Sequence, residues 1–137
     1  MSEVSECAVE RETEHDQLLF DVFAQRCPSR ATLEHLTGRW GVLAMAALHD
    51  GTFRFNELRR RVHGVSEKML AQTLQALERD GFVHREAQHT IPPKVEYSLT
   101  DRGKRTAALL VELIHDVEAQ MPDVIAANQR YDAAKNG

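Results

Sequence analysis

Residues 55–81, FNELRRRVHGVSEKMLAQTLQALERDG, decide the fold of this 137-residue chain. Phe55, Leu58 and Val62 recur at the spacing of one face of a helix. The three consecutive arginines at 59–61 fall outside that apolar face. These residues predict a short helix whose outer surface is basic.

A tight turn and a second helix follow. Residues 63–65, His-Gly-Val, interrupt the helical pattern, and Ser66 is a residue type that caps helix N-termini. The second helix is expected to run to about Arg79 and to stop at Gly81, since glycine suits the position just after a helix. Two helices joined by a short glycine-containing turn form the helix-turn-helix motif, whose second helix lies in the major groove of DNA.

The second helix has two contrasting faces. At 100° per residue, three leucines gather on one of them: Leu70, Leu74 and Leu77. The opposite face carries Lys68, Gln72, Gln75 and Arg79. Glutamine pairs with adenine and lysine reaches guanine in the major groove. A solvated surface is the plain alternative, but the position within a helix-turn-helix favours DNA contact.

Beyond Gly81 the spacing of the apolar residues changes from helical to alternating. Residues 82–85 and 95–99 are therefore expected to be strands, and two prolines in the segment 87–94 cannot continue a paired strand. Two strands joined by a basic loop directly after a recognition helix form a wing. Three residues of this wing are expected to contact phosphates or the minor groove: Arg85, His89 and Lys94.

Three expectations concern the residues before the motif. Residues 1–14 are acidic, lack apolar periodicity and are expected to be a disordered tail. Apolar residues at helical spacing predict a short helix over 17–25. Residues 32–48 predict two short helices or one kinked helix, with Trp40 as the core anchor, because two glycines interrupt the pattern.

A long helix is expected from Thr100 to about Met121, and Pro122 is expected to break it before a last helical stretch. Its apolar stripe consists of Leu110, Ile114, Val117 and Met121. Because a wing and three short helices cannot cover this stripe as well as the core, we expect a homodimer through the terminal helices. The fold class is thus mainly α with a small antiparallel β-wing. A DNA-binding domain with dimerisation helices spans 15–121, and 122–137 form a C-terminal dimerisation helix or tail.

The formal charge of −4 is unevenly distributed along the chain. Residues 1–25 carry one Arg against seven acids, residues 26–105 carry fourteen Lys and Arg against nine acids, and residues 106–137 carry two against five. A basic middle between acidic ends suits a phosphate-binding surface. The N-terminus does not resemble a signal peptide, and no apolar run is long enough to span a bilayer. We therefore expect a cytoplasmic protein without membrane contact.

Cys27 lies between Arg26 and Arg30, close to an expected helix start. Guanidinium groups and a helix N-terminus favour the reactive thiolate, although most cytosolic cysteines are inert. Cys7, in the acidic tail, has the opposite environment. The seven histidines lack the spacing of metal ligands, and no phosphate-binding loop or nucleophile elbow is present. No metal, cofactor or enzymatic activity is therefore expected.

Five blocks in order resemble one family. They are Cys27-Pro28, Gly38-Arg39-Trp40, RFNELRR at 54–60, SEKML at 66–70 and PPKVEYSLT at 92–100. Over about residues 27–121 the chain resembles the HxlR-type winged helix-turn-helix regulators of bacteria. The resemblance implies a homodimer that binds an inverted repeat of double-stranded DNA. The residues expected to contact DNA are Arg54, Arg59, Arg60, Ser66, Lys68, Met69, Gln72, Thr73, Gln75, Arg85, His89 and Lys94.

The resemblance also implies that Cys27 senses oxidants or electrophiles such as quinones, hypochlorite or aldehydes. The chain departs from the family at Gln88 and His89, where tyrosine and often proline are usual, and it has no cysteine in its C-terminal helices. A sensing disulfide would then pair Cys27 with Cys7 or with Cys27 of a second copy, or Cys27 acts alone.

The sequence thus predicts a dimeric regulator, a repressor of a stress or detoxification gene, gated by chemistry at Cys27. One alternative is a non-covalent, uncharged small-molecule effector in a pocket under Trp40 and the C-terminal helix. Another is a winged-helix module that contacts only proteins, since the overall charge is negative.

Overall fold

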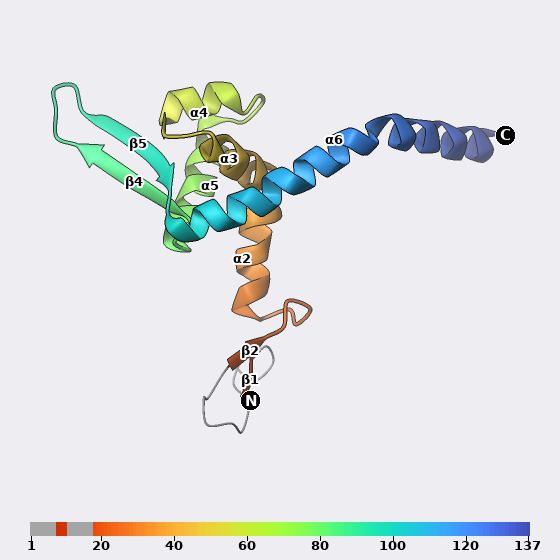
Figure 1. Ribbon diagram of the computed structural model, residues 1–137, viewed down its shortest axis with the longest axis horizontal. Helices are drawn as coiled ribbons and strands as arrows, with labels where there is room; N and C mark the ends of the chain where they lie inside the picture. Colours follow the sequence, from red (N-terminus) through yellow and green to blue (C-terminus); the bar gives the residue numbers. More distant parts are fainter. Residues whose placement is uncertain (1–7, 11–17) are drawn as a thin grey trace.

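The computed structural model describes residues 8–10 and 18–137. A body of four helices packs on the first half of a long C-terminal helix, and a two-stranded hairpin extends from it (Figure 1). The second half of the long helix extends on the opposite side (Figure 1). The elements in chain order are β1 (Ala8–Glu10), β2 (Leu18–Phe20), α2 (Pro28–Thr37), α3 (Arg39–His49), β3 (Phe53–Arg54), α4 (Phe55–Arg61), α5 (Glu67–Arg79), β4 (Val83–Gln88), β5 (Lys94–Leu99) and α6 (Asp101–Asn136).

Helix α3 lies at the centre of the core and packs against α2, α4, α5 and α6. Gly41 allows the close approach of α2, because a Cβ there would lie 1.9 Å from the carbonyl oxygen of His35. Two helices over this stretch are confirmed, but Trp40 as the core anchor is wrong. Trp40 is half-buried at the first turn of α3, over the turn at Gly64, whereas Met45 is completely buried.

A small antiparallel sheet has the strand order β3-β5-β4. The wing hairpin pairs Val83 with Leu99 at its base and Gln88 with Lys94 near its tip. Strand β4 is longer than the expected residues 82–85, so the connecting loop is reduced to 89–93. Strand β3 has two residues, too few to show an alternating pattern, and the sequence did not predict it.

The expected helix over 17–25 is wrong. Residues 18–20 form β2, which pairs with β1, and a turn follows. The Asp21 side chain accepts a hydrogen bond from the backbone N–H of Phe23 at 2.9 Å, a local bond that competes with helix formation. Residues 8–10 of the expected disordered tail form β1, and the rest of that tail lies outside the described residues.

Helix α6 begins at the Thr100 cap, whose hydroxyl accepts a hydrogen bond from Gly103 N–H at 3.0 Å. The expected break at Pro122 is wrong, since the helix continues to Asn136. Proline removes one backbone hydrogen bond, and it does so here on a stretch that is exposed to solvent. The helix instead bends in its C-terminal part (Figure 1). Within the described residues, no helix is both long and apolar enough to span a membrane.

Candidate nucleic-acid interface

Helix α5 is fixed by its cap and by its leucine face, as the sequence predicted. The hydroxyl of Ser66 accepts a hydrogen bond from the backbone N–H of Met69 at 3.1 Å. Leu70, Leu74 and Leu77 are buried in the core. Burying one face of an amphipathic helix fixes the rotation of the helix, so the opposite face is held toward solvent.

The exposed face of α5 presents the expected polar residues. Lys68, Gln72 and Gln75 are exposed, and Met69 retains 41% of its accessible surface. Thr73 is half-buried and lines a groove of about 340 Å³ together with Trp40 and Gln72. Four of the expected contact residues therefore lie on one accessible surface, and Thr73 lies at its edge.

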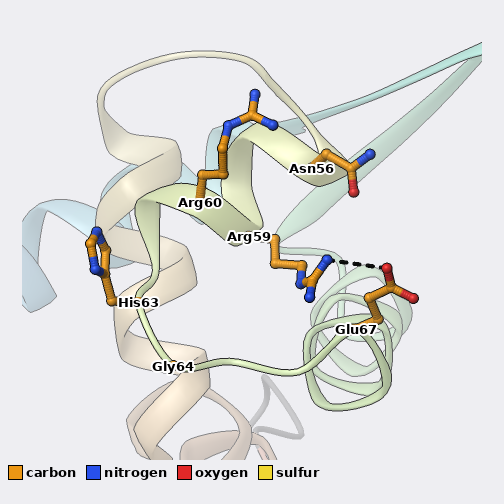
Figure 2. A pocket seen from close by; sticks show the side chains of 6 residues that line it. All are labelled: Asn56, Arg59, Arg60, His63, Gly64 and Glu67. Atoms are coloured by element: carbon orange, nitrogen blue, oxygen red, sulfur yellow. Dashed lines mark hydrogen bonds and ion pairs between the residues drawn. The ribbon is translucent and has the colours of Figure 1, made fainter.

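A polar groove of about 620 Å³ lies between α4 and α5 (Figure 2). Gly64 has φ +90°, a conformation that favours glycine, and it closes the turn between the two helices. Arg59 reaches across this groove to Glu67, with Nη1 3.1 Å from Oε1 (Figure 2). The groove is lined by Asn56, Arg59, Arg60, His63, Gly64 and Glu67.

The three consecutive arginines of α4 have different surroundings. Arg59 pairs with Glu67, and Arg61 lies 4.0 Å from a carboxylate oxygen of Asp50. Arg60 is exposed and makes no ion pair with any residue that the structure describes. It lines both the α4–α5 groove and a second groove beside the wing. Arg60 is therefore the arginine of this run that is placed to take a phosphate.

The second groove, of about 540 Å³, lies between the start of α4 and the wing. Arg54 caps α4, and its backbone N–H donates to Glu57 Oε1 at 2.8 Å. Lys94, at the start of β5, lines this groove with Arg54 and Arg60. The fold therefore brings three expected DNA contacts from separate parts of the sequence into one basic groove.

The two remaining wing residues, Arg85 and His89, lie in different places. Arg85 lines a space of about 310 Å³ with Lys68, Gln72 and Gln75, so it stands beside the outer face of α5. His89 is exposed in the loop at the wing tip and lines none of these grooves. His89 therefore lies apart from the surface that α4 and α5 form.

Sequence reasoning missed Asn56 and His63 as lining residues of the α4–α5 groove. A signal was present, because positions 56, 59, 60 and 63 have the spacing of one helix face. Reading the arginines as one charged run concealed this spacing.

Cys27 lies at the start of α2, far along the chain from these grooves. It is the N-cap residue, 2% exposed, and its Sγ is 3.1 Å from the hydroxyl oxygen of Ser29. Arg30 hydrogen-bonds to the carbonyl of Phe23 at 3.4 Å and lies 3.9 Å from Glu34. The helix start is as expected, but burial restricts access to the thiol.

Two separate cavities replace the single expected pocket under Trp40 and the C-terminal helix. Trp40 lines the small groove beside α5. A larger cavity, of about 630 Å³, lies between α3, the end of α4 and α6. The sequence could not show that Trp40 lines the groove beside α5 and not the cavity beside α6. In the described part of the chain, His, Cys, Asp and Glu side chains form no group of three that could hold a metal ion.

The chain is similar to known transcription regulators. The model of the HxlR-like helix-turn-helix family matches residues 35–124. The HTH-type transcriptional regulator YtfH of Escherichia coli is 53% identical over 113 residues, which cover 82% of this chain and 90% of that protein. The solved structure of the ytfH regulator from Salmonella typhimurium is 51% identical with a TM-score of 0.76, over 80% of this chain and 97% of that one. The solved structure of the redox regulator HypR in its oxidised form is 40% identical with a TM-score of 0.62. This match covers 68% of this chain and 96% of HypR.

Proposed function

Since this chain belongs to the HxlR-like helix-turn-helix family of DNA-binding transcription regulators, we propose that it is a homodimeric, cytoplasmic repressor of an inverted-repeat operator. The observation that carries the proposal is the exposed Arg60, which lines both the polar α4–α5 groove and the basic groove beside the wing, next to the polar face of α5. Its relatives regulate transcription, which is a non-enzymatic role, and we propose no enzymatic activity.

The geometry supports two sets of proposed DNA contacts. Lys68, Gln72 and Gln75, with Met69 beside them, read base edges, because they stand on the accessible face of the recognition helix. Arg54, Arg60 and Lys94 hold phosphates in the groove between α4 and the wing. Arg59, Thr73 and Arg85 line the neighbouring grooves and support these two sets, and Ser66 caps α5. His89, at the wing tip, is proposed to contact DNA separately.

Dimerisation is proposed through α6 and the N-terminal segments. Leu109, Leu113 and Val117 of α6 are 66%, 53% and 46% exposed in the single chain. Large apolar side chains are also exposed before α3, among them Phe23 and Leu33. Exposed apolar side chains at successive turns of one helix, as on α6, mark an interaction site, and a second copy would cover them. Leu110, part of the expected stripe, is instead buried in the core of its own chain.

Redox control through Cys27 is the proposed signal. Two observations support it: the thiol lies at a helix N-terminus beside Ser29, and the redox regulator HypR is a 40% identical neighbour. Because Cys27 is 2% exposed, an oxidant or electrophile reaches it when the start of α2 opens. Cys7 lies outside the described residues, so its pairing stays a prediction.

A non-covalent effector is the second candidate signal, favoured by the cavity between α3 and α6. Such an effector would change the same DNA-binding activity, but it would bind in this cavity and need no reaction with a thiol.

The test is operator binding by the full-length protein. Fluorescence anisotropy with the intergenic DNA upstream of its own gene should show tight binding that weakens steeply with salt, and weaker binding to random DNA. Diamide should release the operator. Equal binding to both DNAs at every salt concentration, or no binding at all, would refute the proposal and leave the protein-interaction module.

A further inference from the structure

The cavity between α3 and α6 has the size and lining of a small-molecule site. Its volume is about 630 Å³, within the range of ligand pockets of roughly 300–1,000 Å³. Ala46 of α3 and Val111 and Ile114 of α6 belong to its apolar wall. Such a wall buries the flat, apolar body of a ligand, and a few polar groups then fix its orientation.

The polar lining of the cavity consists of three histidines, one arginine and two acids, of which Asp50 is one. Three histidines line it, His49, His63 and His115, together with Arg61. The Arg61 guanidinium is 4.0 Å from Asp50, and both side chains are about 60% exposed, which makes a weak surface ion pair. Arg61 therefore keeps the capacity to bind a carboxylate in a bidentate manner. Glu118 is the other acid of the lining.

We propose that this cavity binds a small aromatic carboxylate, with the ring on the apolar wall and the carboxylate toward Arg61 and the histidines. A metal ion is not the occupant that the geometry favours, because among the described residues no three ligating side chains converge.

The site is compatible with the proposed dimer. Val111, Ile114 and Glu118 line the cavity, whereas Leu109 and Leu113 belong to the exposed apolar stripe. At 100° per residue the two sets are centred roughly 150° apart around α6. A second copy that covers the stripe thus leaves the cavity open.

His63 connects the cavity with the DNA-binding surface, because it lines both this cavity and the α4–α5 groove (Figure 2). A bound carboxylate adds negative charge beside the groove where Arg60 is proposed to hold a phosphate. It should therefore lower the affinity for operator DNA. This last step rests on the proposed function, but binding to the cavity does not.

The first test uses the full-length protein in the absence of DNA. Isothermal titration calorimetry measures its binding of 2-naphthoate, which serves as the probe. Saturable binding of one molecule per chain is expected. Arg61→Gln should weaken it at least 5-fold, and Ala46→Phe, which fills the cavity, should abolish it. Arg130→Gln removes the same charge at the far end of α6 and should change nothing. Circular dichroism verifies that each variant is folded.

Naphthalene-2-carboxamide keeps the ring and lacks the charge, so it should bind at least 5-fold more weakly. The proposal is overturned if 2-naphthoate does not saturate the protein, if Arg61→Gln binds it as wild type does, or if the amide binds equally well. With operator DNA present, 2-naphthoate should lower DNA affinity about 5-fold or more in wild type and leave Ala46→Phe unchanged. Binding of the probe with unchanged operator affinity would overturn the connection through His63.

Discussion

His35 and Asp80 join the helix that starts at Cys27 to the end of the recognition helix. His35 Nδ1 lies 2.7 Å from Asp80 Oδ2, and the Asp80 side chain is 10% exposed. Asp80 is the C-cap residue of α5, and its backbone carbonyl also accepts a hydrogen bond from Arg102 of α6 at 3.2 Å. Helices α2, α5 and α6 thus meet at Asp80.

Removing this contact should destabilise the fold. Asp80→Ala leaves the half-buried His35 without its acceptor, and we expect a loss of about 1–3 kcal/mol in the free energy of unfolding. Asp80→Asn keeps an acceptor and should cost less. Urea denaturation measures both. The matched control is Arg79→Ala, because Arg79 is 83% exposed and pairs with Asp80 only at 3.8 Å. Equal stability of Asp80→Ala and Arg79→Ala would show that the His35–Asp80 contact is not stabilising.

Direct base readout should depend on Gln72. Gln72→Ala removes an exposed amide from the middle of the outer face of α5, so operator affinity should fall by about 1–3 kcal/mol. Affinity for random DNA should change much less, since base contacts carry the sequence preference. Anisotropy titrations with both DNAs at one salt concentration provide the comparison. An equal loss on both DNAs would contradict the assignment of α5 as the reading helix.

Phosphate binding should depend on Arg60 and much less on its neighbour. Arg60→Ala should weaken binding to operator and random DNA alike, and it should reduce the slope of log affinity against log salt by about 1. Arg61→Ala is the matched control, because Arg61 lines the cavity between α3 and α6 and neither of the two grooves that Arg60 lines. If the two variants change the salt slope equally, the arginine run acts as one diffuse charge and the separation seen in the structure has no functional meaning.

The helix-turn-helix could be predicted because local rules decide it. Ser66 caps α5, Gly64 takes the turn conformation, and three leucines bury one face of α5, so each signal lies within a few residues. The grooves could not be predicted in the same way. Arg54 and Lys94 are forty residues apart in the sequence, and long-range contacts such as the β3–β5 pairing bring them to one site.

The errors also have physical reasons. Leu19, Val22 and Phe23 have helical spacing, but the segment is short, and pairing with β1 and a local Asp21 hydrogen bond replace the helix. At Pro122 one lost hydrogen bond is outweighed by a helix that continues for many residues on both sides. In both segments, interactions outside the local sequence pattern determine the structure.

The exposed apolar stripe of α6, which contains Leu113 and not Leu110, gives a specific test of dimerisation. Leu113→Asp puts a charge on an exposed apolar face of α6, so the protein should become monomeric while the fold persists. Leu110→Asp should instead unfold the chain, since Leu110 is 7% exposed within its own core. Sedimentation velocity and circular dichroism distinguish the two outcomes.

Ala108→Asp is the control, because Ala108 is exposed on another face of α6 and should leave a dimer. A Leu113→Asp protein that stays dimeric at micromolar concentration, or a wild-type protein that is monomeric there, would contradict dimerisation through this stripe.

Cys27 combines a buried thiol with a position at the start of α2, and this combination makes a kinetic prediction. In a Cys7→Ser background, iodoacetamide should modify Cys27 more slowly than a small free thiol, because the reaction waits for the helix start to open. Mild urea should accelerate the reaction before global unfolding. Mass spectrometry of the modified chain measures the rate. A reaction as fast as that of a small thiol would show that Cys27 is accessible in the native state.

Modification of Cys27 should then release DNA. Serine is nearly isosteric with cysteine, so Cys27→Ser should bind operator normally yet ignore diamide, quinone and hypochlorite, whereas Cys7→Ser should respond at least in part. The route that we propose for this effect runs along α2 from Cys27 to His35 and through Asp80 to α5. In a dimer, the two recognition helices must match successive major grooves about 34 Å apart, so a small shift of α5 costs affinity. Asp80→Ala should therefore weaken the response to diamide as well as the fold. Operator release from Cys27→Ser by diamide would exclude this cysteine as the sensor and favour the non-covalent effector.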